Sequence, residues 1–466
     1  MRRSRISVVV LCSVVPLLCG ALLGKCGLVE SDFVRVSESG FEPVDNAADS
    51  NDYPWSMAFF TPEGASEGRL YAGTGNNFIG IQDHLNRTND VDSLPIRPAE
   101  IRRYRPELGG REWERVYDSG DEGVPFEAIG FRSMREYRAQ SDGVLYLYAG
   151  SCGLDASLYR SATGDPGTWE RVFEWGKRGS IRGLEAHGGL LYFSTTVIDV
   201  VDDNFGTVEG MIFATDGDTV WPVIEDGFGN PNNLETIALR SFNGWLYAGT
   251  RNKHEGFEIW KFAGSGAMNN PVPVVTNGGP DPRNEAAGTA LVFQDRLYFG
   301  TLIFGGFVNF LEDRRKGADL IRIARDDSWE TVIGEDGISG MGPGFDDPRN
   351  HYIWSLAEFN GWLYAGTADN SHVIAWAIVN LPQLPGLITG RIPFADAREV
   401  PPALANIGGL GADLYRSLDG VHWAPVFTRG LGNHNNFGLR TMNSASGHLY
   451  LGFTNPLDGL EIWRTK

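Results

Sequence analysis

Three arginines stand at matching places in three short segments of the chain. Each begins a triplet that ends in Met or Leu: Arg132-Ser133-Met134, Arg182-Gly183-Leu184 and Arg440-Thr441-Met442. A guanidinium group binds a carboxylate through two parallel hydrogen bonds, so a fold that gathers the three would create an anion site. The alternative is that neighbours such as Glu127 and Glu185 neutralise them, because buried charges are normally paired.

The triplets belong to a unit that is repeated along the chain. Its most regular part is the run Leu-Tyr-Ala-Gly-Thr at Leu70–Thr74 and Leu363–Thr367, with related runs in five further copies. The first triplets of the other copies are Trp55-Ser56-Met57, Ile237-Ala238-Leu239, Thr289-Ala290-Leu291 and Trp354-Ser355-Leu356. A repeated unit of this length indicates a repeat architecture.

Each of the first six copies contains four short apolar segments separated by turns that mostly carry glycine, which indicates four antiparallel strands. The seventh copy ends at Lys466 after its third segment, and Phe33-Val34-Arg35-Val36 near the start has the aromatic-x-x-Val pattern of the missing fourth. The sequence therefore predicts an all-β, seven-bladed β-propeller with four strands per blade, the last blade being completed by the N-terminal strand.

The domain organisation follows from the two ends and one long insertion. Residues 1–26 have a basic start and an uncharged run, which is typical of a signal peptide or a membrane anchor. Residues 27–466 form the predicted propeller, with a long insertion at 373–411. We expect a secreted or cell-envelope protein that contacts a membrane only through an uncleaved N-terminal segment.

The composition of the chain restricts the classes of partner that it can bind. The net charge of −19 is unsuited to a nucleic-acid backbone, which would repel the protein. Four cysteines in 466 residues are too few for a disulfide scaffold. The histidines show no metal-ligand spacing, and neither a Ser-centred elbow nor a phosphate loop is present. The expected partner is an unknown small molecule, glycan or protein.

Two sets of residues are candidates for ligand binding. The first strand of each blade lies nearest the axis of a propeller, which places Arg132, Arg182 and Arg440 with Trp55 and Trp354 around one channel. Loops before these strands carry Asn233, Asn284, Asn350 and Asn436. Their oxygens suit either calcium ligation at the channel mouth or turn capping, and recurrence in several blades favours capping. No cofactor is expected otherwise.

Two hairpins resemble the Asp-box of sialidase-like propellers. They read Ser161-Ala162-Thr163-Gly164-Asp165 before Trp169, and Ser417-Leu418-Asp419-Gly420 before Trp423. The resemblance covers about ten residues per copy and implies a fold. That family clamps a substrate carboxylate with three arginines and uses a tyrosine–glutamate pair and an aspartate for catalysis, but no such catalytic set is matched in this sequence.

Two functions remain open. The first is an exported, non-catalytic propeller that binds a ligand, glycan or protein partner through the channel-mouth loops and the insertion. The second is a hydrolase or lyase that acts on an acidic saccharide or lactone, with the arginines as anion clamps. The second requires an unpaired carboxylate near the axis to serve as acid or base.

Overall fold

The chain is an all-β protein in this computed structural model, and its strands pair in antiparallel fashion. The structure describes residues 27–41, 51–76, 97–108, 110–122, 128–197, 211–264, 270–304, 316–369, 410–456 and 458–466. The predicted signal or anchor segment and nearly all of the 373–411 insertion lie outside these residues. Within them, no helix has the length and apolar character needed to cross a membrane.

The described strands pair in groups of four, numbered here from first to seventh. The first group is β2 (Tyr53–Phe60), β3 (Arg69–Gly75), β4 (Glu100–Tyr104) and β5 (Trp113–Asp118). The second is β6 (Gly130–Arg138), β7 (Leu145–Gly153), β8 (Ser157–Ser161) and β9 (Glu170–Glu174). The third is β10 (Gly179–His187), β11 (Leu190–Val197), β12 (Met211–Thr215) and β13 (Val220–Ile224).

The remaining groups repeat this order of pairing. The fourth is β14 (Glu235–Phe242), β15 (Trp245–Arg251), β16 (Ile259–Phe262) and β17 (Val272–Val275). The fifth is β18 (Ala286–Phe293), β19 (Arg296–Leu302), β20 (Leu320–Ile323) and β21 (Trp329–Ile333). The sixth is β22 (Asn350–Phe359), β23 (Trp362–Asp369), β24 (Leu414–Ser417) and β25 (Trp423–Phe427).

The seventh group joins the two ends of the described chain. It contains β26 (Gly438–Ala445), β27 (His448–Thr454) and β28 (Glu461–Thr465), and its outer strand is β1 (Phe33–Arg35). Phe33 pairs with Thr465 and Arg35 with Trp463. The pairing of the N-terminal strand with the last strand, expected from the aromatic-x-x-Val pattern, is thus present.

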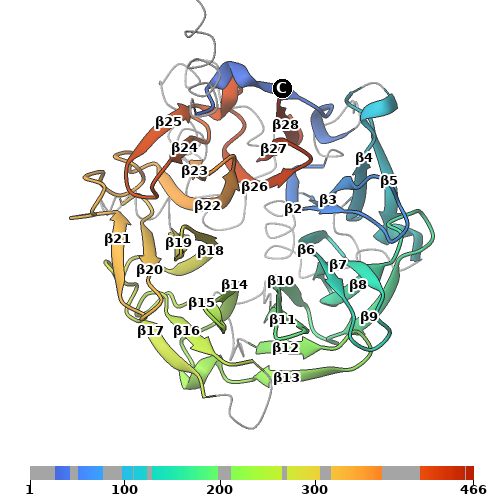
Figure 1. Cartoon of the computed structure of the whole chain (residues 1–466), viewed down its shortest axis with the longest axis horizontal. Coiled ribbons are helices and arrows are strands. Elements are labelled where there is room, and N and C mark those ends of the chain that lie inside the picture. Colours follow the sequence, from blue (N-terminus) through green and yellow to red (C-terminus); the bar gives the residue numbers. More distant parts are fainter. Residues whose placement is uncertain are drawn as a thin grey trace, which may run out of the picture.

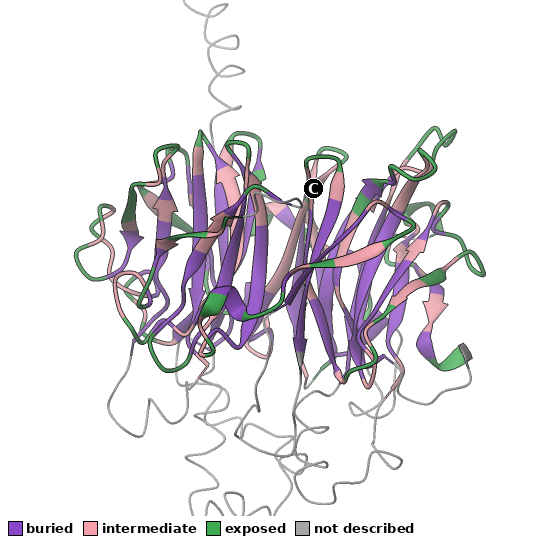
Figure 2. Ribbon diagram, turned by 90° about the horizontal axis from the view of Figure 1, so that it is seen from below, coloured by how far each residue is buried: buried purple, intermediate pink, exposed green. Residues whose placement is uncertain are grey.

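The first strand of each group faces a common centre, as Figure 1 shows for β2, β6, β10, β14, β18, β22 and β26. The second strand of each group is buried along most of its length, whereas the fourth strands and many turns are half-buried or exposed (Figure 2). Short 3-10 helices occupy the connections: η1 (Glu30–Asp32), η2 (Ser39–Phe41), η4 (Pro106–Leu108), η5 (Ser119–Glu122), η6 (Gly227–Gly229) and η9 (Gly430–Gly432).

Neighbouring groups are joined by one recurring backbone hydrogen bond. The amide that follows a second strand donates to the carbonyl just before the next first strand, as in Asn76 to Ile129 and Asn252 to Glu285. The same bond joins the seventh group to the first, where Asn455 donates to Asp52 over 3.0 Å. The contact between the ends of the repeat array is therefore of the same kind as the internal contacts.

The tyrosine of the Leu-Tyr-Ala-Gly-Thr run packs between groups. Tyr247 is fully buried, and its hydroxyl donates to Asp327 Oδ1 of the next group over 2.7 Å. This places Tyr247 in packing between sheets and not in a ligand cluster. At equivalent positions Tyr71 and Tyr298 meet the turns that contain Gly164 and Gly420.

The two Asp-box-like hairpins are built differently. Asp419 Oδ1 accepts the backbone amides of Val421 and His422 and so caps its own turn. In the other hairpin the Ser161 hydroxyl accepts the amide of Gly164, and Asp165 forms an ion pair with Arg103 of the first group. The Asp-box assignment stays a prediction.

Gly420 tests this packing, because a Cβ there would lie 2.0 Å from the Tyr298 hydroxyl. We expect Gly420→Ala to lower the free energy of unfolding by about 1–3 kcal/mol more than Gly361→Ala. Gly361 has a similar positive φ, 77° against 74°, but an added Cβ there meets no atom within 4 Å. Urea denaturation measures both.

Tyr298→Phe removes the clashing hydroxyl oxygen, so the difference should shrink when Gly420→Ala is combined with it. Equal losses for the two glycine variants would contradict the packing argument.

Candidate functional site

Every first strand carries a β-bulge at the same place. Pairing with the second strand skips a residue between Pro54 and Ser56, and correspondingly in the other groups. The skipped residues are Trp55, Arg132, Arg182 with Gly183, Ile237, Gly288, Trp354 and Arg440. A bulge takes a residue out of the ladder and re-aims its side chain, which explains why the candidate residues of the seven repeats converge.

The skipped residues and those that follow them line one cavity of about 240 Å³, which we call the central cavity. Its lining contains Arg132, Arg182 and Arg440 together with Trp55 and Trp354. In the fifth group the lining starts at Gly288, so the sequence alignment that placed Thr289 there is wrong by one residue. Glycine has no side chain, and Leu302 fills the space beside it, since a Cβ on Gly288 would lie 2.4 Å from Leu302 Cδ1.

Two of the arginines lie over tryptophans from the preceding group. Arg132 Cζ is 4.5 Å from the ring centroid of Trp55, and Arg440 Cζ is 5.1 Å from that of Trp354. Cation–π contacts of this length are attractive, especially where water is excluded. Trp55 itself lies against Gly75 and Gly130, where any side chain would collide with its ring. The indole rings are thus fixed, and they orient the guanidinium groups.

The third arginine is neutralised. Arg182 forms an ion pair with Glu235, which also binds Arg251 over 2.8 Å. Glu185, the partner suggested by the sequence, pairs instead with Arg135 over 2.7 Å and Arg240 over 3.6 Å. Glu127 lies outside the described residues.

Arg440 has a different environment. Among the described residues it forms no ion pair, and burial together with the positive charges of Arg132 and Arg182 lowers its pKa to about 9. Burial and the charge of Arg182 also lower the pKa of Arg132, to about 10. The protein therefore holds positive charge in the central cavity at a free-energy cost, and an anion would relieve that cost.

The rest of the lining offers no acid or base. No Asp or Glu is among the described residues that line the central cavity. The fourth and fifth groups contribute Ile237, Ala238, Gly288 and Ala290 to the lining, which also contains Met and Leu residues. Such a cavity can hold the charged end of a ligand on one side and a short apolar body on the other.

The four candidate asparagines lie elsewhere and are at most 1% exposed. Each side-chain amide donates to the carbonyl of the glycine six residues earlier and to a carboxylate at the start of the third strand of its own group. The partners are Gly227 and Glu258 for Asn233, Gly278 and Asp319 for Asn284, Gly344 and Asp413 for Asn350, and Gly430 and Glu461 for Asn436. They hold loops in place and do not line the central cavity.

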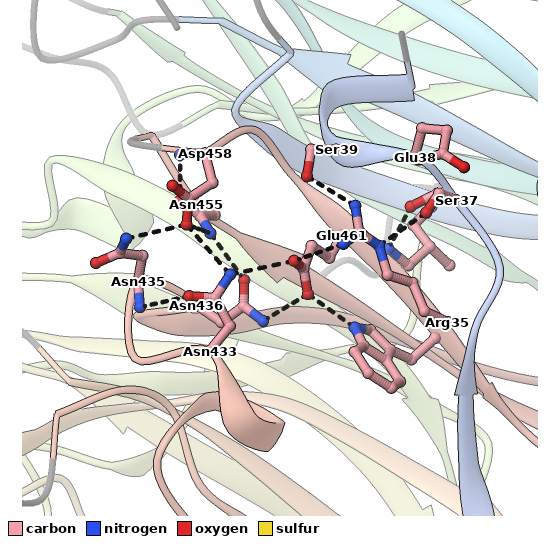
Figure 3. A network of polar contacts seen from close by, with 12 residues as sticks. Arg35, Ser37, Glu38, Ser39, Asn433, Asn435, Asn436, Asn455, Asp458 and Glu461 are labelled. Carbon is pink, nitrogen blue, oxygen red and sulfur yellow. Dashed lines mark hydrogen bonds and ion pairs between the residues drawn. The ribbon is translucent and has the colours of Figure 1, made fainter. Parts of the chain in front are cut away.

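Figure 3 shows this network in the seventh group. Asn436 Nδ2 is 2.9 Å from Glu461 Oε2, and Asn455 donates to Asn436 Oδ1 over 3.0 Å. Arg35 of the N-terminal strand forms an ion pair with Glu461 over 3.1 Å. The N-terminal strand is thus attached by a buried carboxylate as well as by its ladder.

Some residues that interact with the cavity arginines could not be predicted from the sequence. Glu235 and Arg251 are brought together by the pairing of β14 with β15, Glu235 also binds Arg182, and neither belongs to a recurring motif. Within the described part of the chain no group of His, Cys, Asp and Glu side chains suits a metal ion. Calcium binding stays a prediction that no contact supports.

Comparison with known proteins adds little. No family model and no curated protein matches the chain. Among solved structures, it is similar to an ancestral GH74 enzyme, with 12% identity over 89% of this chain and a TM-score of 0.49. It is also similar to puromycin hydrolase, with 11% identity over 92% of this chain and a TM-score of 0.45. The chain spans 48% and 55% of those two chains.

The environment of Arg440 predicts how its replacement changes the free energy of unfolding. Replacing an uncompensated buried cation by an apolar side chain of similar length removes its desolvation cost, so Arg440→Met should raise the free energy of unfolding by about 1–3 kcal/mol at neutral pH. The folded-state pKa of about 9 lies below the usual 12.5. The cost is therefore fully present below about pH 9 and falls progressively as the pH rises from there toward the usual 12.5, so the gap between the two proteins should narrow over that range.

Chemical denaturation across that pH range measures the effect. A variant that is less stable than the wild type at neutral pH would mean that Arg440 has a structural partner.

Proposed function

We propose that the chain is a closed, seven-bladed β-propeller, exported from the cytoplasm, that binds a small carboxylate-bearing ligand in the central cavity without transforming it. Closure is supported by the pairing of β1 with β28 and by the hydrogen bond from Asn455 to Asp52. Seven groups of four strands correspond to the seven repeats of the sequence.

The observation that carries the proposed ligand is Arg440. An arginine that lies over Trp354, has no ion partner among the described residues and has a lowered pKa is costly to the folded protein. Such a residue is expected where function requires it, because stability alone would replace it. The carboxylate would lie against Arg440 and Arg132, and the ligand body would extend toward the apolar part of the lining at Ile237 and Ala290.

The hydrolase or lyase alternative is less well supported. It requires an acid or base near the bound anion, and the described lining of the central cavity contains no carboxylate. The nearest carboxylate of the arginine network is Glu235, which binds two arginines and has a lowered pKa despite burial, owing to Arg182 and Arg251. A carboxylate held in this way is a poor proton acceptor.

Ligand binding tests the proposal directly. The purified protein is titrated by calorimetry with a panel of small carboxylates of increasing apolar length and with the matching neutral amides. We expect at least one carboxylate to bind and its amide to bind about tenfold more weakly or worse. Arg440→Met should abolish that binding.

The matched control is Arg325→Met, which removes an exposed arginine paired with Asp295 and should leave binding unchanged. Binding that survives Arg440→Met, or a panel in which no carboxylate binds, would refute the proposed ligand class. Turnover of an ester, lactone or glycoside that is lost in Arg440→Met would refute the non-catalytic assignment.

A further inference from the structure

A second cavity lies at the junction between the seventh and first groups, away from the central cavity. It has a volume of about 610 Å³, within the range of small-molecule sites. We call it the junction cleft. Its lining is mostly polar: Ser66, Glu67, Arg69, Ser446, His448 and Arg464, with Phe59, Gly68, Leu70, Tyr104, Pro106 and Tyr450.

The junction cleft lacks a contact that several other junctions have. At three of them the tyrosine of the second strand is covered by a turn of the next group, Tyr71 by Gly164, Tyr192 by Gly264 and Tyr298 by Gly420. Tyr450 is the equivalent tyrosine of the seventh group. Its hydroxyl has no hydrogen-bond partner among the described residues, and it lines the junction cleft instead.

Arg464 also lacks a partner that three other groups provide, as does Arg416 of the sixth group, which faces Ala424. The equivalent arginines of three other groups each face a glutamate on the fourth strand and bind it: Arg103 with Glu114 at 2.8 Å, Arg160 with Glu170 at 2.6 Å and Arg322 with Glu330 at 2.7 Å. Arg464 faces Val34, because the N-terminal strand supplies the fourth strand of this group. Within the described residues Arg464 forms no ion pair.

The other polar groups of the junction cleft leave this charge uncompensated. Arg464 Nη1 is 2.6 Å from His448 Nε2, and His448 Nδ1 contacts the Thr465 carbonyl, so the imidazole is neutral and accepts from the arginine. Arg464 Nε is buried and has no hydrogen-bond partner in the described part of the chain. Glu67, which is the one carboxylate among the described lining residues, is exposed and binds Arg69 over 3.0 Å.

From this geometry we infer that the junction cleft is a second ligand site, which binds an acidic sugar through its carboxylate and hydroxyl groups. Arg464 would bind the carboxylate by charge-assisted hydrogen bonds. The Tyr450 hydroxyl, Ser66 and Ser446 would bind ring hydroxyls, and Phe59 with Pro106 would contact the apolar face of the ring. The inference does not depend on the central cavity.

Val34 provides a test that leaves Arg464 in place. Val34→Glu restores the cross-strand carboxylate that the equivalent arginines have, so it should neutralise Arg464. Calorimetric titration with glucuronate should show binding to the wild type that is weakened about tenfold or more by Val34→Glu and by Arg464→Met. Val34→Gln, which is similar in size but uncharged, should bind like the wild type.

Arg322→Met is the matched control, since it removes an equivalent arginine in another group and should leave binding intact. If glucuronate also binds in the central cavity, that part of the binding will be lost in the Arg440→Met variant. Glucuronate binding unchanged by Val34→Glu and Arg464→Met, or no glucuronate binding at all, would overturn the inference. If glucose binds as tightly as glucuronate, the proposed role of the carboxylate is wrong. If propionate binds to the same residues as tightly as glucuronate, the site does not recognise the sugar ring.

Discussion

The structure depends on a β-bulge that recurs in the first strand of every group. A regular strand would alternate its side chains between the two faces of its sheet, and residues such as Arg132 or Arg440 would pack between sheets. The bulge removes one residue from the ladder and lets its side chain leave the sheet plane. Because the groups stand around a common centre, the skipped residues meet in one cavity. The residue types at the skipped positions then determine which ligands the central cavity can bind.

The ring of skipped residues around the central cavity has a positively charged part and an apolar part. The arginines belong to the second, third and seventh groups, and Glu235 compensates only the third-group Arg182. The cost of keeping Arg440 charged is reduced by Trp354, but a cation–π contact is weaker than a buried ion pair with good geometry. The same reasoning applies to Arg464, which faces Val34 where three other groups have a glutamate, so that its cation lies beside an open cleft. In both places the departure from the repeat identifies a candidate site.

The repeat pattern predicted much of the fold because each copy carries its own turn glycine, buried tyrosine and period-two strands. The pairing of Phe33 with the last strand followed from a missing segment and needed no structure. The bulges could not be predicted in this way. An alignment places residues in register but does not say which one leaves the ladder, so Gly288 was missed in favour of Thr289.

Ion partners were predicted poorly for the same reason. Glu185 is close to Arg182 in the sequence, yet Glu235 is its partner because β10 and β14 are neighbours around the centre. The asparagines recur with the regular spacing of a structural element, and the structure uses them for loop attachment. The sequence did not distinguish Arg464 from the basic residues of other third strands, because its difference lies in its cross-strand neighbour.

The central claim is that the ring of skipped residues holds a carboxylate against Arg440, and diffraction from crystals soaked in 4-bromobenzoate tests it most directly. The account predicts an anomalous bromine peak inside the central cavity of the wild type, with the carboxylate against Arg440, and no such peak in Arg440→Met. Wild-type crystals that bind 4-bromobenzoate only at surface sites, with the central cavity empty, would contradict it.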